Sequence, residues 1–404
     1  MTRTADNNLD VLRVFAALLV LVGHSYIFQG RPERLFLGMT PLGPIGVYIF
    51  FIISGYLVTA SWDRDPQLFR YFARRLLRII PGLAVCIFLS VFVLGPLMTT
   101  LPLSTYFRQS TTYAYFTNVA LYITYYLPGV FEVGHVPNAV NGSLWSLPVE
   151  FTMYIVVAVL GVTRGNRWVY LGVFVLSALG AYFWAWRADM VVFYRYDVRQ
   201  IFICGTFFWA GAVFFKFDLV RHLSTTAVVL AVTGLLCLEA FPPLLGIAQW
   251  VLLPVIVLAF GFAFSPLLLK LTATGDYSYG IYIYAFPIEQ TVVHLLPGMP
   301  IGRYMLLCTA LTYAAAILSW HLVEKRALSF KPRKSLRYAD RGIPGVAVPA
   351  VERAPEPQAG GGASAALQAP HDEPSRTQRV GIEDALDVDN RAAGDHLVRV
   401  VRDR

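Results

Sequence analysis

Apolar stretches of about twenty residues recur along this chain from its start to about residue 325. Each is long enough to cross about 30 Å of hydrocarbon as a helix. Hydrophobic residues make up 56% of the 404, and only 14% are charged, whereas soluble domains carry roughly 25% charged residues. The short alternating segments of a transmembrane barrel are absent from the sequence. The chain is therefore expected to be all-α, a polytopic membrane helical bundle.

About ten transmembrane helices are predicted. They cover Leu9–Phe28, Pro44–Ala60, Ile79–Met98, Leu147–Val162, Trp168–Trp186, Arg199–Lys216, Thr225–Phe241, Ile247–Phe264, Tyr277–Leu296 and Ile301–Val323. The first lacks a small-residue cleavage pattern, so we expect a retained span rather than a signal peptide. The segment Tyr113–Phe131 is long enough to span but rich in tyrosine, which favours the membrane interface. We interpret it as interfacial or re-entrant.

Lysine and arginine placement predicts cytoplasmic N and C termini, because cytoplasmic loops carry the excess of both residues. Five arginines lie between the second and third spans, and a basic group covers residues 325–334. The loops on the opposite side hold fewer positive charges. An eleventh span at Tyr113–Phe131 would turn the basic loops around Arg164 and Lys216 outward. The asymmetry therefore favours ten spans.

Residues 335–404 differ in composition from residues 1–334, which form the predicted transmembrane domain. The stretch "VERAPEPQAGGGASAALQAPHDEPSR" is rich in Pro, Ala and Gly and has no apolar periodicity, so a disordered cytoplasmic tail is predicted. The tail contains 9 basic and 11 acidic residues. The tail is therefore slightly negative, and the positive charge behind the net +8 lies in the membrane part, where topology accounts for it, so no nucleic acid partner is expected.

The four cysteines each lie within an apolar run, far from one another in sequence: Cys86, Cys204, Cys237 and Cys308. Neither the spacing of a metal site nor a disulfide framework can be recognised among them. No metal is expected.

His24 lies within the apolar run "LLVLVGHSYIF". It could be a histidine near a helix end, wetted by headgroup water or bonded to a neighbouring helix. An ionisable group inside a span is costly, however, and usually marks function. At 100° per residue, Asp10, Arg13, Ala17 and His24 share a band of roughly 60° on the first helix. This face is expected to point into the bundle.

Glu150, in "NGSLWSLPVEF", is the second candidate. It could simply be a carboxylate near a helix N-terminus, where the dipole favours it. His24 lies about one turn from the outer end of its helix, and Glu150 about one turn inside the outer start of the fourth span. We therefore expect both in the same leaflet, with the carboxylate orienting the imidazole as a catalytic pair. Glu239 and Glu289 are alternative partners for His24.

An arginine cluster in "FRYFARRLLRIIPG" leads into the third span. Arg70 and Arg74 are interpreted as topology charge. Arg75 and Arg78 lie three residues apart on one helical face, where two guanidiniums suit a phosphorylated ligand on the cytoplasmic side. Topology charge remains the alternative for this pair too.

Two weaker candidates are Ser54 and Trp145. Ser54 precedes Gly55 in "FFIISGYL", and Ser and Gly within a span more often indicate close helix packing than catalysis. Residues Gly142–Trp145, together with Tyr113–Phe131, could line a groove for an acceptor.

The chain resembles the acyltransferase 3 family, integral membrane O-acyltransferases that modify lipopolysaccharide, exopolysaccharide, Nod factors and some antibiotics. The similar motifs occur in the family's order: "LDVLRVFAALLVLVGHSY", "FFIISGYL", "RRLLRIIPG", "SLWSLPVEF", "YSYGIYIYAFP" and "SWHLVEKRAL". They span residues 9 to about 330. Two departures occur. Ala285 and Phe286 stand where many members carry a His before Pro, and Arg326 stands where Pro usually follows Glu-Lys.

The resemblance implies roles for individual residues. His24 matches the essential first-helix His, and Arg13 the first-helix Arg. Arg75 and Arg78 match the arginine pair tied to acyl-CoA use, and Glu150 matches the acid of the Leu-Trp-Ser-Leu motif.

The implied activity is transfer of an acyl group, expected to be acetyl from acetyl-CoA, to a hydroxyl of a carbohydrate or lipid-linked glycan acceptor. The implied place is the inner membrane, with cytoplasmic acyl-CoA on Arg75 and Arg78 and His24 as the base. Two other classes stay open: a secondary transporter or flippase, although no convincing internal repeat supports one, and a scaffold that recruits partners through its tail.

Overall fold

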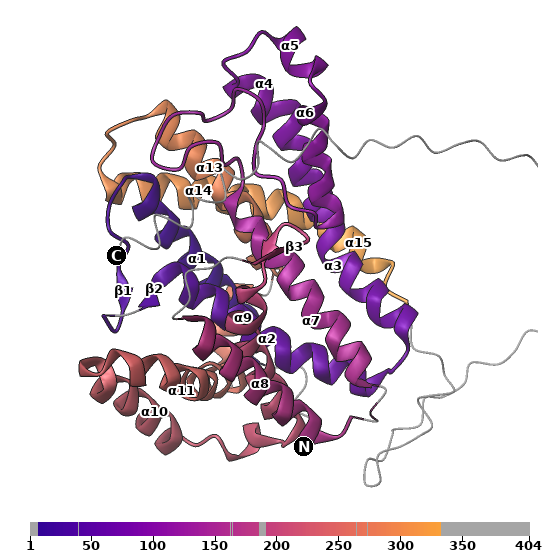
Figure 1. Ribbon diagram of the computed structural model, residues 1–404, viewed down its shortest axis with the longest axis vertical. Helices are drawn as coiled ribbons and strands as arrows, with labels where there is room; N and C mark the ends of the chain where they lie inside the picture. The colour runs from indigo at the N-terminus through magenta and orange to yellow at the C-terminus, as the bar shows by residue number, and fades with distance from the viewer. Residues whose placement is uncertain are drawn as a thin grey trace, which may run out of the picture. The chain divides into compact units, whose positions relative to one another are not determined.

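The computed structural model describes residues 7–38, 40–161, 163, 165–185, 191–263, 265–272 and 274–332. The predicted tail, 335–404, lies outside the described residues. Helices dominate, and two short antiparallel hairpins pair Phe36 with Thr40 and Phe193 with Tyr196 (Figure 1).

The elements follow in this order: α1 Leu9–Phe28, β1 Leu35–Phe36, β2 Thr40–Pro41, α2 Leu42–Arg64, α3 Leu68–Leu89, η1 Ser90–Leu94, α4 Gly95–Met98, α5 Leu103–Arg108, α6 Ser110–Ala114, η2 Tyr115–Ala120, η3 Gly142–Trp145, α7 Ser146–Gly161, α8 Arg167–Ala185, β3 Val192–Phe193, β4 Tyr196–Asp197, α9 Arg199–Lys216, η4 Leu219–His222, α10 Thr225–Cys237, η5 Leu238–Ala240, α11 Pro242–Phe262, α12 Pro266–Thr272, α13 Ser278–Leu295, α14 Ile301–Ser319, η6 Trp320–Glu324 and α15 Lys325–Ser329.

Each predicted span overlaps helix in the residues that the structure describes, and three spans cross more than one element: Ile79–Met98, Thr225–Phe241 and Ile301–Val323. Among the described residues, seven helical stretches are long and apolar enough to cross a membrane: 9–28, 42–64, 68–98, 142–161, 167–184, 243–262 and 301–329. The protein is thus a multi-pass helical membrane protein, and the count of ten remains a prediction. The last helix continues through Arg326 to Ser329, so the missing Pro after Glu-Lys lets the helix run on.

The segment Tyr113–Phe131 is not a continuous helix. It contains the end of α6 and then η2, which stops at Leu121 in the left-handed region with φ 61°. A later stretch, residues 138–145, runs along α13 instead. Gln290 donates to the carbonyls of Ala139 and of Val136 just before the stretch, and Tyr282, two turns nearer the start of α13, donates to the carbonyl of Ser143.

A proline in α13 provides the backbone carbonyl to which residues 138–145 attach. Pro287 has no N–H, so the carbonyl of Ile283, four residues earlier, loses its helical partner. Asn141 Nδ2 donates to that carbonyl at 2.8 Å. The sequence thus creates an acceptor on α13 and supplies the side chain that satisfies it, as a non-helical segment at membrane depth requires.

Glycines bring three of the central helices into close contact. A Cβ on Gly23 of α1 would lie 2.8 Å from the backbone nitrogen of Gly43 in α2, so these two residues share one level of the bundle. A Cβ on Gly55 of α2 would overlap the carbonyl oxygen of Phe208 in α9. The close helix packing expected around Ser54 is thus seen at its neighbour Gly55.

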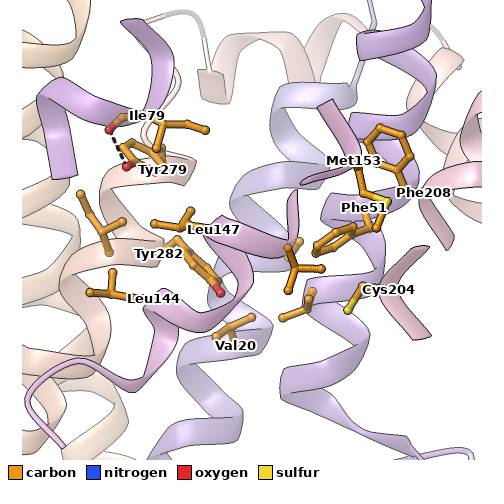
Figure 2. Close-up of a cluster of buried hydrophobic side chains, with 14 of the residues drawn as sticks. Val20, Phe51, Ile79, Leu144, Leu147, Met153, Cys204, Phe208, Tyr279 and Tyr282 are labelled. Atoms are coloured by element: carbon orange, nitrogen blue, oxygen red, sulfur yellow. Dashed lines mark hydrogen bonds between the residues drawn. The ribbon is translucent and has the colours of Figure 1, made fainter. Parts of the chain in front are cut away.

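The core between these helices is apolar with a few tyrosine hydroxyls. Figure 2 shows Phe51 of α2 beside Met153 and Phe208, and Tyr279 of α13 beside Ile79 of α3. The Tyr279 hydroxyl donates to the carbonyl of Ile79 at 2.7 Å. In a regular helix the carbonyl of Ile79 accepts one bond, from the N–H of Leu83, and it has room for a second. The bond from Tyr279 can therefore tie α13 to α3 without breaking either helix.

Candidate active site

His24 lies on the face of α1 that packs against α13, and its partner there is Glu289. The distance from His24 Nδ1 to Glu289 Oε2 is 3.9 Å, longer than a hydrogen bond. Ser25 Oγ donates to the other oxygen, Oε1, at 2.5 Å, and Glu289 is fully buried. Within the described part of the chain, neither Nδ1 nor Oε2 has a hydrogen-bond partner. A movement of about 1 Å would join them.

Aromatic rings enclose the imidazole. The ring of Phe286 meets it edge-on with centroids 5.1 Å apart, and Phe28 lies at 6.3 Å. Phe286 also covers Gly142, where a Cβ would meet its ring at 2.5 Å. With Nδ1 turned toward Glu289, Nε2 is the nitrogen left to face a reactant. The predicted orientation of His24 into the bundle is confirmed.

The structure does not bring Glu150 to His24, so the expected pairing of these two residues is wrong. Glu150 is hydrogen-bonded to Ser54, which lies eleven residues along α2 from Gly43, or about 16 Å. Because Gly43 lies level with Gly23, the residue before His24, Glu150 is far below the imidazole. The depth estimate failed because it placed the start of the fourth span at the outer surface, whereas η3 and residues 138–145 enter the bundle first.

Glu150 belongs to a different cluster. Its Oε1 accepts hydrogen bonds from Ser54 Oγ at 2.6 Å and from the Tyr154 hydroxyl at 2.7 Å. The guanidinium carbon of Arg75 lies 5.5 Å from the centroid of the Tyr154 ring and 5.6 Å from that of Tyr71. Arg75 Nε is buried and has no hydrogen-bond partner among the described residues.

Asp276, just before α13, is the partner of Arg78, the second arginine of the predicted Arg75–Arg78 pair. Arg78 of α3 forms a short ion pair with it, and Arg13 of α1 lies 3.6 Å from the same oxygen. Arg13 also bonds Asp10 at 2.9 Å, and the Asp10 side chain is half exposed. Burial alone would raise the pKa of Asp276, but the charges of Arg78 and Arg13 outweigh it and lower the pKa to about 2. This carboxylate therefore stays ionised and holds three helices together.

The remaining arginines of the cluster have structural partners. Arg70 and Arg74 both bond Asp65, at the turn between α2 and α3. Hydrogen bonds from Arg70, helped by Arg74, lower the pKa of Asp65 against the effect of its burial. Arg70 and Arg74 thus have a structural role at this turn, in addition to the topology charge predicted for them.

Positive charge nevertheless accumulates at this end of the bundle. Desolvation and the charges of nearby arginines lower the pKa of Lys331: Arg78, Arg75, Arg74 and Arg13. Five cations thus lie close enough to influence one another, and the three carboxylates paired with arginines here, Asp10, Asp65 and Asp276, neutralise only part of that charge. Such a place suits a multiply charged anion.

One face of α13 extends from the arginine cluster to the neighbourhood of His24. Asp276 precedes this helix, and Tyr279, Tyr282, Phe286 and Glu289 follow at spacings of three or four residues, which place them on one side. The thirteen residues from Asp276 to Glu289 rise about 20 Å. The arginine cluster and His24 therefore lie at opposite ends of a single helical face.

Two acidic residues near the arginines are not among the site residues predicted from the sequence. Asp276 lies in a short connection between helices, and its partner Arg78 is 198 residues away in sequence. Glu324, in the motif "SWHLVEKRAL", is buried with Oε2 unpartnered in the described structure, and Ser319 donates to its Oε1 at 2.8 Å. An acid inside an apolar run was the available signal for Glu324.

Trp145, in η3, is partly buried and packs against the main apolar core. Among the described residues, no group of three His, Cys, Asp or Glu side chains could hold a metal ion.

Comparison with known proteins adds independent information. The profile described as an acyltransferase domain, of the acyltransferase 3 type, matches residues 6–320. The O-acetyl transferase of Shigella phage Sf6 is 33% identical over 82% of this chain and 99% of its own. Nodulation protein 10 of Rhizobium leguminosarum bv. viciae is 28% identical over 80% of this chain and 94% of its own. The peptidoglycan O-acetyltransferase OatA of Listeria monocytogenes is 27% identical over 37% of this chain and 23% of its own. No solved structure matches the chain.

Proposed function

Because this chain belongs to the acyltransferase 3 family, we propose that it transfers an acetyl group from cytoplasmic acetyl-CoA to a hydroxyl of a carbohydrate acceptor. The relatives named as O-acetyl transferase and peptidoglycan O-acetyltransferase support the reaction class. The protein is thus an acyltransferase rather than a transporter or a scaffold. We place it in the inner membrane, with the acceptor a cell-envelope or exported glycan.

The observation that carries this proposal is the pairing of His24 with the buried carboxylate of Glu289. Glu289 favours the tautomer in which Nδ1 carries the proton, which leaves the Nε2 lone pair free to accept one. Nε2 removes the proton from the acceptor hydroxyl as its oxygen attacks the thioester carbon. The carbon–sulfur bond breaks, and the proton passes from His24 to the departing thiolate.

The donor is anchored at the opposite end of the bundle. Its phosphates bind the basic cluster, in which Arg75 has a free Nε and Arg78 is held by Asp276. The pantetheine arm is on the order of 20 Å long when extended, which matches the rise of α13 between Asp276 and Glu289. The thioester then reaches His24 while the nucleotide stays on the cytoplasmic side.

A ping-pong route, in which His24 itself carries the acetyl group, uses the same residues. Initial rates measured while both substrates are varied distinguish the routes. Parallel double-reciprocal lines indicate an acetyl-His24 intermediate, and intersecting lines indicate direct transfer.

The function is tested with purified protein, radiolabelled acetyl-CoA and envelope glycans. The wild type is expected to add a mass of one acetyl group to the glycan, and His24→Ala to lose at least about 100-fold in rate with unchanged membrane insertion. Glu239→Gln, at an exposed carboxylate, serves as control and should match the wild type. Full activity in His24→Ala would remove its role as base, and no labelled glycan from the wild type would refute the assigned reaction.

A further inference from the structure

Glu150 uses only one carboxylate oxygen for contacts within the protein. Oε1 accepts both bonds, from Ser54 and from Tyr154. Oε2 accepts none from the residues that the structure describes, and it keeps accessible surface. Two donors fix the carboxylate in place and leave a second acceptor pointing away from them.

This carboxylate also lacks a cation. Six aspartates in the described structure have one: Asp10, Asp63, Asp65, Asp197, Asp218 and Asp276. Glu150 shares the lack of one with two buried acids, Glu289 and Glu324, but its Oε2 is the one of the three free oxygens that keeps accessible surface. In the described structure no Lys or Arg lies within ion-pair distance of Glu150. A charge at this depth needs hydrogen-bond donors, and those that the chain supplies all go to Oε1. We therefore expect the hydrogen-bond donor for Oε2 to belong to a bound ligand.

The position of Glu150 limits which chemical groups could donate this hydrogen bond. Glu150 lies one helical turn from Tyr154, whose ring is stacked with Arg75. It thus lies next to the proposed phosphate anchor and about 16 Å short of the level of His24. A carboxylate repels phosphate, so a ligand whose phosphates bind Arg75 must present a different group to Glu150, a hydrogen-bond donor that adjoins its phosphorylated end.

We propose that Glu150 Oε2 binds the pantetheine arm of the donor by accepting a hydrogen bond from one of its amide N–H groups. The inference rests on the proposed function, because the donor there is acyl-CoA. The arm carries two amide N–H groups and one hydroxyl and no charge. A bond from such a group to a carboxylate is charge-assisted and roughly twice as strong as a neutral one. Glu150 is then a donor-binding residue rather than the partner of His24.

Two parts of acyl-CoA therefore bind at separate places in the protein. Arg75 recognises phosphate, and Glu150 recognises the arm. Adenosine 3′-phosphate 5′-diphosphate contains the phosphates of CoA and lacks the arm, so it is a probe for the first place alone.

The experiment measures equilibrium binding of CoA and of this nucleotide to the purified full-length protein. Glu150→Gln is the test variant, because its amide oxygen can still accept from Ser54 and Tyr154 while an NH₂ group replaces Oε2. We expect Glu150→Gln to weaken CoA binding about tenfold and to leave the nucleotide unchanged. Arg75→Ala should weaken both ligands, and Glu239→Gln neither.

Two results would overturn the assignment of Glu150: unchanged CoA affinity in Glu150→Gln, or an equal loss for CoA and nucleotide, which would indicate a general structural effect. A wild type that binds neither ligand is a different failure, because it refutes acyl-CoA as donor and the arm site with it. His24→Ala, which should bind CoA normally while inactive, separates binding from chemistry.

Discussion

At the scale of single residues, the site is defined by polar atoms that lack partners. Glu289 is fully buried, and Ser25 satisfies only one of its oxygens. The other faces His24 Nδ1 across 3.9 Å, and neither atom is hydrogen-bonded within the described residues. Such a pair is costly to keep in a membrane unless it acts on a substrate. Its place beside the imidazole makes Glu289 a positioning residue.

Glu289→Gln should therefore lower kcat by about 10- to 100-fold and leave KM for acetyl-CoA unchanged. The amide oxygen can still accept from Ser25, so packing is preserved, while the charge that orients His24 is lost. Glu289→Asp, which keeps the charge on a shorter side chain, should recover part of the rate. Steady-state kinetics at varied acetyl-CoA give both constants. A raised KM with normal kcat would assign Glu289 to substrate binding instead.

The same residues show what the sequence can predict. His24, Arg75 and Arg78 stand out because a charge inside or beside an apolar run is costly. Glu289 could be proposed only as one of several partners, since the relative depth of two helices depends on where each begins. Asp276 carries no such signal, because acids are common in connections between helices and its partner is distant in sequence.

At the scale of helices, α2 is held between α1 and α9 by contacts that leave no room for side chains. Gly55 of α2 meets the carbonyl of Phe208, and Gly211 of α9 meets that of Ile52. Ser54, the neighbour of Gly55, thereby reaches Glu150. The close approach of α2 and α9 thus sets the position of the Glu150 carboxylate.

Gly55→Ala should destabilise the protein by about 1–3 kcal/mol, because the added methyl overlaps a backbone oxygen that cannot rotate away. Unfolding in detergent can be followed with a thiol-reactive dye, which reports three buried cysteines: Cys86, Cys204 and Cys308. The exposed Cys237 is replaced by Ser throughout to remove background.

Gly172→Ala in α8 is the matched control, since a Cβ there has no neighbour within 4 Å. It should leave the unfolding temperature unchanged or raise it slightly. Equal effects of the two substitutions would argue against the close contact at Gly55.

Helix positions were predictable, and both ends of α1 and α9 were predicted to the residue, but the start of the third span was not. Hydropathy placed the third span at Ile79–Met98, whereas the helix begins at Leu68. The arginines interrupt the apolar run but not the backbone hydrogen bonds, so Arg70 to Arg78 lie on the helix rather than before it. Residues 138–145 have no periodic pattern, and their position depends on Asn141 finding the carbonyl freed by Pro287.

At the scale of the whole transmembrane unit, acids clamp the end that carries the basic cluster. Asp65 joins the end of α2 to α3, and Asp276 joins α1, α3 and the start of α13. Both carboxylates have pKa values below the ordinary one, about 2 for Asp276. Their contribution to stability is therefore complete above about pH 4 and is lost as the pH falls through the folded-state pKa.

The unfolding temperature should accordingly decrease between about pH 4 and pH 2. Asp276→Asn should be less stable than the wild type at neutral pH, by at most about 2 kcal/mol, and should show a weaker dependence on acid. Thermal unfolding over this range, with the same dye, checks both. Parallel pH profiles for the variant and the wild type would show that the Asp276 ion pairs contribute little.

Residues 138–145 lie against α13 as largely non-helical chain, on the side that holds His24. A stretch whose backbone is satisfied by side chains can be lengthened or exchanged while the surrounding helices keep their register. The surface that this stretch presents near His24 can then change while the arginines and the histidine keep their places. A change of acceptor would require substitutions in one short segment, with the donor site and the chemistry left as they are.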